Sequence, residues 1–303
     1  MQSKSLSSSY ILTADIGGSH ITVGICDLRT YGIVSQSIIR AEVNSKRSIT
    51  DILTSWTNAL QEVLRKNTVP QVSRLSVAMP GPFDYEKGIS YITGLDKYEA
   101  LYGVNIKQYL ADLLEMDPQL ILFRNDAEST IAGEVLTGAG KGYINVMGVT
   151  LGTGFGSACS KAKVTKDINL GSIRYKDSIA DDYLSTRWFI KRYYELTGAK
   201  LTGGVKQLAQ IAVENTVARD VFKEFAVNMA DFLSGPIKQL TPDVLVICGN
   251  IAKASEFFLP QLARELSSVH IKLGQLDENA PLIGAAAVFD NKILPASINS
   301  VKQ

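Results

Sequence analysis

The chain has 303 residues, a length that favours two compact lobes or one large α/β domain. Hydrophobic residues make up 46% and charged residues 20%, a globular composition that excludes an intrinsically disordered chain. The 31 Lys and Arg residues balance the 30 Asp and Glu residues, and a net charge of +1 creates no field for nucleic acid or an anionic membrane. We therefore expect no nucleic acid and no membrane among its partners.

Cysteine and histidine are scarce, and their spacing excludes a zinc site. Cys26, Cys159 and Cys248 lie far apart in apolar segments without C-x-x-C spacing, and the two histidines are also far apart. We expect three buried thiols in a reducing compartment. Residues 1–9 are polar and Ser-rich and lack the apolar stretch of a signal peptide, which predicts a disordered tail and a cytoplasmic protein.

In the first half of the chain, strands alternate with helices, which is the pattern of an α/β fold. Apolar runs on either side of the turn Gly17–Ser19 predict a β-hairpin. Apolar residues at helical spacing behind Ser48, a favoured N-cap residue, predict a helix. The expected elements are strands at 10–16, 21–28, 33–40, 75–79 and 120–123, and helices at 49–64 and 105–115.

The second half repeats this plan. The segments 15–28 and 150–163 each contain a strand, a glycine turn and a second strand, which suggests two related lobes. No Gly/Ser or Pro/Gly linker separates the halves, so we expect the lobes 10–124 (with 288–303) and 125–287 to share a cleft. The further expected elements are strands at 144–151, 155–162, 244–248 and near 269, and helices at 181–196, 215–240, 250–267 and 281–289.

Glycine turns carry the first functional signal. Gly17 and Gly18 follow one strand, Gly152 and Gly154 follow another, and Gly249 ends a third. The backbone N–H groups of such turns can approach a phosphate closely, because glycine has no Cβ and tolerates positive φ. Each turn alone could be a simple hairpin, but matched turns favour a polyphosphate site. The P-loop pattern does not fit, because Gly140-Lys141 is followed by Gly142 and residue 135 is Val. The Rossmann pattern does not fit, because a strand and not a helix is expected after Gly154.

Two aspartates lie beside the predicted strand ends. Asp15 precedes the first glycine turn, where a carboxylate can bind the Mg²⁺ that accompanies a nucleoside triphosphate; a turn-capping role is the alternative. Asp126 lies between a buried strand and a helix, where α/β proteins place ligands, and it could equally be an N-cap residue. A catalytic Asp126 would be the general base that takes the proton of an alcohol attacking a γ-phosphoryl group.

Six motif-like segments follow one another along the chain. They are ADIGGSHITVGICDL, SVAMPGPFDYEKGI, LFRNDAESTIAGE, VTLGTGFGSA, LVICGNIAKA and ENAPLIGAAAVF. In this order they resemble the ROK family of repressors, open reading frames and kinases, which includes bacterial glucokinases and N-acetylhexosamine kinases. The resemblance covers nearly the whole chain after residue 9. It implies an α/β, actin-like (ribonuclease H-like) two-lobe ATPase fold, with ATP and a sugar meeting in the interdomain cleft.

The resemblance also implies roles for individual residues. Asp126 matches the family's catalytic aspartate and Asn125 a neighbouring sugar contact, while Gly81 and Gly94 fall where loop backbone meets sugar hydroxyls. ATP is the implied cosubstrate, Mg²⁺ the implied metal at Asp15, and a homodimer the implied assembly. The implied ATP-binding positions are Asp15, Gly17, Gly18, Ser19, Gly152, Thr153, Gly154, Gly249 and Asn250.

The chain departs from the family pattern at the expected sugar site. Family kinases carry a Glu and a His in a G-E-I-G-H segment, then a zinc loop and a further Glu. Here Ser172 and Tyr175 occupy the first two positions, the zinc loop is missing, and Asp181 occupies the last position. A hydrogen bond from a carboxylate to a sugar hydroxyl is stronger than a neutral one, so the sugar pocket is chemically altered.

The motifs together favour an ATP-dependent, Mg²⁺-requiring sugar kinase of the glucokinase type. We expect it to phosphorylate a hexose hydroxyl, at C6 of glucose, an N-acetylhexosamine or a related sugar. The alternative is a non-catalytic ROK-type sugar or nucleotide sensor with a degenerate sugar site. The presence of Asp15 and Asp126 favours a catalytic protein, whereas Ser172 and Tyr175 favour the sensor.

Overall fold

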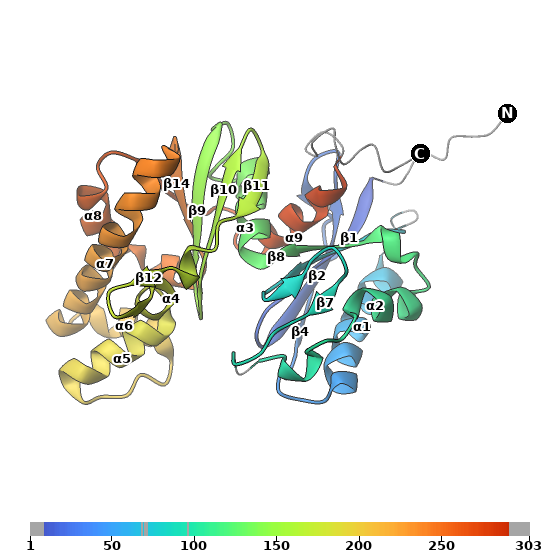
Figure 1. Ribbon diagram of the computed structural model, residues 1–303, viewed down its shortest axis with the longest axis horizontal. Helices are drawn as coiled ribbons and strands as arrows, with labels where there is room; N and C mark the ends of the chain where they lie inside the picture. The colour runs from blue at the N-terminus through green and yellow to red at the C-terminus, as the bar shows by residue number, and fades with distance from the viewer. Residues whose placement is uncertain (1–8, 68, 70–71, 96, 291–303) are drawn as a thin grey trace. The chain divides into compact units, whose positions relative to one another are not determined.

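The structure is a computed structural model that describes residues 9–67, 69, 72–95 and 97–290 (Figure 1). The chain forms two compact units, each built around its own β-sheet. The first unit combines residues 1–137 with 278–303, and the second contains residues 138–277. Residues 1–8 of the expected tail and residues 291–303 of the expected terminal segment lie outside the described residues. In the described part of the chain, no helix is both long and apolar enough to cross a membrane.

The unit boundaries differ from the expected ones. The sequence predicts boundaries after residues 124 and 287, whereas α3 (Asp126–Thr137) and α9 (Asn279–Ala286) both belong to the first unit. These two helices pack directly against each other, and α9 also packs on the sheet of the first unit. A contact between helices so far apart in the chain leaves no local signal in the sequence.

The sheet of the first unit contains the predicted hairpin and three parallel strands. Its strands are β1 (Tyr10–Ile16), β2 (His20–Asp27), β3 (Gly32–Ile33), β4 (Ile39–Glu42), β5 (Leu75–Met79) and β8 (Ile121–Asn125). Their order is β3-β2-β1-β5-β8, with β4 also paired to β2. Because β1, β5 and β8 run parallel, their carboxyl ends meet at one edge of the sheet, where α/β proteins place ligands.

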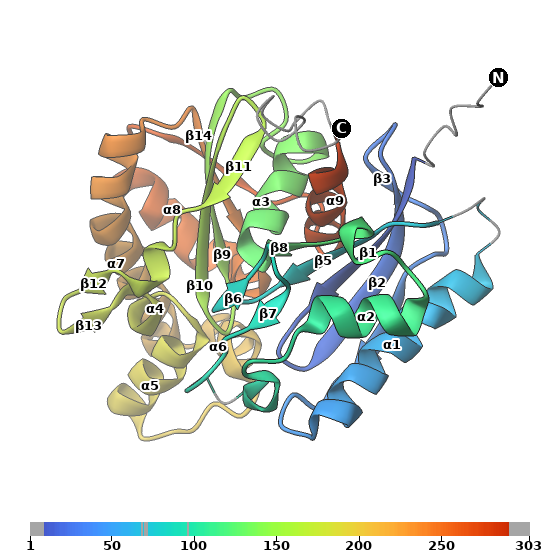
Figure 2. The same ribbon diagram turned by 45° about the vertical axis from the view of Figure 1, so that its right-hand side comes forward.

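One face of this sheet carries the apolar core. α1 (Ile49–Lys66) begins as predicted behind Ser48, whose side chain caps the helix, and α2 (Ile106–Leu114) follows later in the chain. Leu12 of β1 and Trp56 of α1 are fully buried members of the same hydrophobic cluster. Figure 2 shows α1 and α2 lying along the sheet.

The opposite face of the sheet binds α9 through polar and small residues. Side chains alternate along a strand, so Thr13 points to this face, and its hydroxyl donates to the carbonyl of Leu282 at 2.8 Å. The crossing of α3 and α9 has room only for glycine. A Cβ on Gly284 would lie 1.8 Å from the Ser129 carbonyl oxygen, and Gly133 is pressed against α9 in the same way.

The second unit repeats the plan of a sheet covered by helices. Its main sheet has the order β11-β10-β9-β14-β15, with β9 (Asn145–Leu151), β10 (Phe155–Lys161), β11 (Val164–Asp167), β14 (Val244–Cys248) and β15 (His270–Leu273). Its helices are α4 (Ala180–Tyr183), α5 (Thr186–Thr197), α6 (Gly204–Ala212), α7 (Thr216–Leu240) and α8 (Ser255–Glu265). A small hairpin joins β12 (Arg174–Tyr175) to β13 (Ser178–Ile179).

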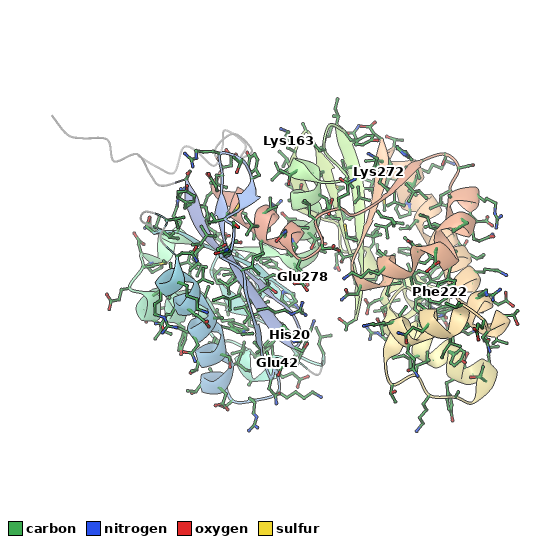
Figure 3. All side chains as sticks on the ribbon, turned by 180° about the vertical axis from the view of Figure 1, so that it is seen from behind. His20, Glu42, Lys163, Phe222, Lys272 and Glu278 are labelled. Atoms are coloured by element: carbon green, nitrogen blue, oxygen red, sulfur yellow. The ribbon has the colours of Figure 1, made fainter. Side chains whose placement is uncertain are left out.

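Aromatic side chains fill the core between these helices. The ring of Phe189 lies 4.6 Å from that of Phe225 and 5.1 Å from that of Phe222, measured between ring centroids. Phe222, labelled in Figure 3, belongs to α7 and is fully buried. These rings belong to the same hydrophobic cluster as Val149 of β9 and Ile247 of β14, so the helices and the sheet of the second unit share one core.

Two expected elements are interrupted by tertiary hydrogen bonds. The helix expected at 181–196 is broken between α4 and α5, because the N–H and the hydroxyl of Thr186 both donate to the Gly152 carbonyl. The strand expected at 33–40 is broken between β3 and β4, where the Ser37 hydroxyl accepts the N–H of Ile25 at 3.0 Å. The short helix α6, which the sequence analysis did not predict, lies between α5 and α7.

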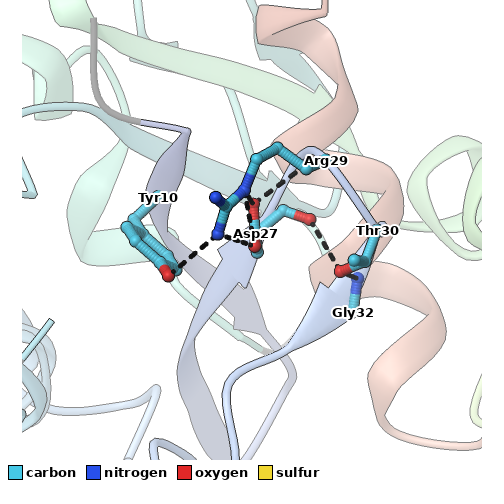
Figure 4. Close-up of polar contacts among 5 residues, drawn as sticks. All are labelled: Tyr10, Asp27, Arg29, Thr30 and Gly32. Carbon is cyan, nitrogen blue, oxygen red and sulfur yellow. Dashed lines mark hydrogen bonds and ion pairs between the residues drawn. The ribbon is translucent and has the colours of Figure 1, made fainter.

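The turn after β2 is fixed by charged and polar bonds (Figure 4). The Arg29 guanidinium donates to both carboxylate oxygens of Asp27, and it reaches the Tyr10 hydroxyl at 3.1 Å. The Gly32 N–H donates to the Thr30 hydroxyl at 3.2 Å. Hydrogen bonds from Arg29 hold the pKa of Asp27 below its ordinary value. At neutral pH the Asp27 carboxylate is therefore ionised and forms a stabilising ion pair with Arg29.

Candidate functional site

The first glycine turn joins β1 to β2 at the carboxyl end of β1. The Gly17 N–H donates to the His20 carbonyl at 2.9 Å, and Figure 3 labels His20 beside the turn. The Ser19 carbonyl accepts the N–H of Val43 at 2.8 Å, which fixes the turn against β4. Neither Gly17 nor Gly18 takes a positive φ, so the expected conformational reason for glycine does not apply here. Glycine suits this turn because it leaves space: a side chain on the exposed Gly18 would obstruct the approach of a ligand to the backbone of the turn.

Asp15 and Asp126 lie at the same edge of the first sheet. Along the sheet, Asp15 is paired with Ala78 of β5, and Ala78 with Arg124 of β8, two residues before Asp126. Neighbouring strands are about 4.8 Å apart, so β1 and β8 are separated by about 10 Å. Both aspartates are half-buried, and the negative charge of Asp126 disfavours ionisation of Asp15.

The two carboxyls have raised pKa values. Burial raises the pKa of Asp15 to about 7; the negative charge of Asp126 adds to the rise, and Arg40 opposes it. Burial also raises the pKa of Asp126, whereas the Ala127 N–H and the positive charge of Lys97 lower it. Near neutral pH, Asp15 is therefore close to its midpoint of ionisation, and a bound cation would displace its proton.

The residues at this edge fit a magnesium ion that arrives with a nucleotide. Mg²⁺ is usually held by one or two carboxylates together with phosphate oxygens and water. Asp15 supplies such a carboxylate beside a turn in which Gly18 and Ser19 are exposed. Among the residues that the structure describes, no three His, Cys, Asp or Glu side chains gather closely enough to hold a metal by themselves.

The raised pKa of Asp15 predicts a pH-dependent gain in stability on replacement by Asn. Below the unfolded-state pKa of about 4, Asp15 is neutral in both states; as pH rises towards 7, the folded state keeps a proton that the unfolded state has lost, so stability falls. We expect Asp15→Asn to raise the free energy of unfolding at pH 8 by about 1 kcal/mol, since one pKa unit corresponds to about 1.4 kcal/mol and solvent weakens the effect. The gain should vanish near pH 4. Urea unfolding at the two pH values measures it.

The matched control for this prediction is Asp27→Asn. Because the pKa of Asp27 is lowered, its carboxylate stabilises the fold at pH 8, and this contribution is lost as the pH falls. The two substitutions should therefore change the stability at pH 8 in opposite directions. Equal losses of stability in both variants would contradict the account of Asp15.

Helix α3 is capped by Asn125 and not by Asp126. The Asn125 side-chain oxygen accepts the N–H of Glu128 at 3.0 Å, which is the bond of an N-cap residue. Asp126 Oδ1 accepts the N–H of Ala127 at 2.8 Å. Because Asn125 fills the capping role, that alternative no longer accounts for the carboxylate of Asp126.

Two of the predicted sugar-side residues meet at Tyr85. Its hydroxyl accepts a hydrogen bond from the Asn125 amide at 3.2 Å and donates to the Met79 carbonyl at 3.0 Å. A Cβ on Gly81 would lie 3.3 Å from the same hydroxyl. Gly94 lies in a separate loop with a left-handed φ of 69°, so its backbone conformation alone favours glycine. Contact of Gly94 with a sugar stays a prediction.

The second glycine turn joins β9 to β10 in the second unit. Apart from its two chain neighbours, none of the described residues has an atom within 4 Å of a Cβ built on Gly152, so the fold itself does not require glycine there. Gly249 is different: its φ is 92°, and a Cβ would lie 2.4 Å from the Leu151 carbonyl oxygen. β14 and β9 run parallel with Cys248 beside Thr150, which brings Gly249 and the adjacent, exposed Asn250 to this turn.

Asp181 holds the second glycine turn. Its Oδ1 accepts the N–H of Phe155, the residue that follows Gly154, and its Oδ2 pairs with the guanidinium of Arg187. Thr186 fixes the other side of the turn through its two bonds to Gly152. The sequence predicts Asp181 as a sugar contact but gives no signal for Thr186 or Arg187, because these bonds depend on tertiary structure.

Ser172 and Tyr175 are bonded within the second unit. The Ser172 hydroxyl is exposed and donates to the Asn169 carbonyl at 3.1 Å. Tyr175 is 8% exposed, and its hydroxyl donates to Asp231 at 2.8 Å and to the Asn228 carbonyl at 3.2 Å. A sugar would have to compete with these bonds, so contact of either residue with a sugar stays a prediction.

Three residues near the first turn were not singled out by the sequence. The Tyr98 hydroxyl donates to the Gly17 carbonyl at 2.6 Å, and Lys97, the preceding residue, lies along Gly18. The positive charge of Arg40, on β4, lowers the pKa of Asp15, and its guanidinium forms an ion pair with Glu278 at the start of α9. Their contacts join residues far apart in the chain, so no local pattern in the sequence could reveal them.

Comparison with known proteins places this geometry in a family. The model of the ROK family matches residues 11–162, which include both glycine turns and the two aspartates. Glucokinase from Thermotoga maritima is 21% identical over 93% of this chain and 98% of its own length. A ROK family glucokinase from Streptomyces griseus, solved with glucose and AMPPNP, has a TM-score of 0.76 at 19% identity, over 92% of this chain and 98% of that one.

A regulator has the same fold as these kinases. A ROK family transcriptional regulator, a homologue of the E. coli MLC protein, has a TM-score of 0.76 at 14% identity, over 92% of this chain and 77% of its own. The α/β fold is thus the actin-like, ribonuclease H-like fold that the motifs predict. Because the family model spans half of the sequence, from β1 to the end of β10, this chain belongs to the ROK family.

Proposed function

We propose that the protein is an ATP-dependent kinase that transfers the γ-phosphoryl group of ATP to a hydroxyl of a hexose. C6 of glucose, of an N-acetylhexosamine or of a related sugar is the proposed acceptor. The observation that carries this proposal is the placement of Asp15, Asp126 and the first glycine turn at one edge of one sheet. A cation-binding carboxylate, a base and a phosphate-binding turn are the parts that phosphoryl transfer needs.

Each residue at this edge has a specific task in the proposed reaction. Asp126 accepts the proton of the attacking hydroxyl, which requires its ionised form, and Lys97 and the Ala127 N–H both favour that form. Asn125, held by Glu128 and Tyr85, fixes the backbone from which Asp126 projects. Asp15 would hold Mg²⁺, which, when bound, neutralises charge on the phosphates.

The second glycine turn is proposed to bind phosphate or nucleotide in the second unit. The proposed binding surface is the backbone of the turn Gly152–Gly154. At Gly152 this backbone is open, since none of the described residues beyond its chain neighbours has an atom within 4 Å of a Cβ built there. Asp181 and Thr186 hold the backbone of the turn in place. Positioning of this kind supplies much of the rate in phosphoryl transfer.

The test is an ADP-release assay over a panel of hexoses and N-acetylhexosamines with MgATP. The proposal predicts that at least one sugar raises ADP release at least about tenfold above the sugar-free rate. Omission of Mg²⁺ should return the rate to background. The proposal fails if no sugar stimulates ADP release although ATP binds.

Asp181→Ala tests the support of the second turn. Loss of the Phe155 bond should raise the KM for ATP about tenfold, because a hydrogen bond to a charged group contributes about 1.5–3 kcal/mol and 1.4 kcal/mol is tenfold. The KM for the sugar should change less. Asp182→Ala is the control, since Asp182 bonds Ser178 and also lies near Arg187. An equal rise of the ATP KM in both variants would remove Asp181 from this role.

A sensor is the second candidate function. The bonds of Tyr175 to α7 favour it, because they occupy a side chain at the position where family kinases have a sugar-binding His. A sensor would bind sugar or nucleotide, seen as a rise in melting temperature, without any sugar-dependent release of ADP. The same sugar panel therefore separates the two candidates.

A further inference from the structure

Lys97 lies beside the first glycine turn, and its charge lowers the pKa of Asp126 in the same unit. Its Cδ is 3.8 Å from the position that a Cβ on Gly18 would take, so the aliphatic part of the side chain runs along the turn. Its positive charge acts on Asp126. Lys97 is half-buried, so one cation lies beside the first glycine turn and also influences the proposed base.

The backbone of Lys97 is held in place by its neighbour, Tyr98. The Tyr98 hydroxyl donates to the Gly17 carbonyl at 2.6 Å, and its N–H donates to the Ser45 carbonyl at 2.8 Å. The fully buried Tyr98 ring packs edge-on against Trp56, with 5.4 Å between ring centroids. Tyr98 keeps a left-handed φ of 56°, a conformation that an aromatic residue adopts only when its surroundings impose it. These contacts of Tyr98 fix the backbone of Lys97 beside the glycine turn.

A second cation, Arg40, has a different environment. Its guanidinium forms an ion pair with Glu278, and its positive charge lowers the pKa of Asp15. Part of the Arg40 charge is thus neutralised by a carboxylate of the same unit. Lys97 is the cation whose charge reaches the base itself.

We propose that Lys97 contacts the transferring phosphoryl group and stabilises the negative charge on its oxygens. The inference rests on the proposed kinase function. In the step, Asp126 takes the proton of the sugar hydroxyl, and the hydroxyl oxygen forms a bond to the γ-phosphorus. The bond from that phosphorus to the β–γ bridging oxygen breaks, and its electron pair leaves with ADP. Lys97 takes no part in the proton transfer and acts as a point charge.

The proposal is tested with Lys97→Met, which keeps most of the side-chain length and removes the charge, and with Lys97→Arg, which keeps the charge. Lys97→Met should lower kcat about 100-fold with little change in the KM for the sugar, and Lys97→Arg should retain more than a tenth of the wild-type kcat. Lys66→Met is the control, because Lys66 lies on α1 and pairs with Glu62. A kcat within twofold of wild type in Lys97→Met overturns the proposal.

A binding measurement separates this proposal from the proposed function. Titration with AMPPNP and with ADP, each with Mg²⁺, should show that Lys97→Met weakens AMPPNP binding at least fivefold more than ADP binding. Equal weakening of both nucleotides, or of neither, contradicts a contact with the terminal phosphoryl group. This result is informative even if the wild-type protein phosphorylates no sugar of the panel. Unchanged thermal unfolding of both Lys97 variants verifies that the fold is intact.

Discussion

Replacement of Asp126 by Asn is expected to lower kcat about 1,000-fold while leaving the affinity for ATP within about threefold of wild type. A positioned general base contributes about 10²–10⁴-fold to a rate, and an amide cannot accept the proton. Asn keeps the size of the side chain, and its oxygen can still accept the N–H of Ala127. Steady-state kinetics and nucleotide titration on the same preparation measure the two effects.

The matched control is Asp112→Asn, which changes an exposed aspartate on α2 in the same unit. Its kcat and its nucleotide affinity should equal those of the wild type. The role of Asp126 as the base would be refuted by a variant that keeps most of the wild-type rate. A parallel loss of rate and of ATP binding would assign Asp126 to nucleotide binding instead.

Gly284→Ala should cause a large loss of stability in the first unit. A Cβ at this position would lie 1.8 Å from the Ser129 carbonyl oxygen and 2.8 Å from the Gly133 nitrogen, so α9 would have to move away from α3. Alanine normally stabilises a helix interior by about 0.5–1 kcal/mol relative to glycine. Here we expect a loss of about 3 kcal/mol from overpacking, measured by urea unfolding.

Gly152→Ala is the contrasting substitution. In the part of the chain that the structure describes, its Cβ would have no atom within 4 Å beyond its chain neighbours, and Gly152 does not take a positive φ. The free energy of unfolding should therefore stay within about 0.5 kcal/mol of wild type. Gly133→Ala should resemble Gly284→Ala, since its Cβ would lie 2.1 Å from the Ala280 carbonyl oxygen. Near-wild-type stability of both helix variants would mean that α3 and α9 do not cross as closely as the structure has them.

Local patterns in the sequence predicted the elements that depend on local physics. The hairpin around Gly17, the capped helix after Ser48 and the strand before Asp126 are present as expected. These features follow from turn chemistry, N-capping and apolar runs within a few residues of each other. Asp15 and Asp126 could be singled out for the same reason, because each lies where a predicted strand ends.

Features that depend on distant contacts could not be predicted. The crossing of Gly133 and Gly284, the bonds from Thr186 that break the expected helix, and the place of Lys97 beside Gly18 all join residues far apart in the chain. The unit boundaries were missed for the same reason, since α9 returns to the first unit. The tolerance of glycine for positive φ does not explain the first turn, since neither Gly17 nor Gly18 takes one.

The central claim is that Asp126 is the base for transfer of a phosphoryl group to a sugar. Product analysis tests it most directly: the protein is incubated with MgATP and each sugar of the panel, and the products are identified by phosphorus NMR and mass spectrometry. The account predicts a sugar phosphate in equal amount to ADP for wild type, and none above background for Asp126→Asn. Inorganic phosphate in place of a sugar phosphate, or the same sugar phosphate from both proteins, would contradict it.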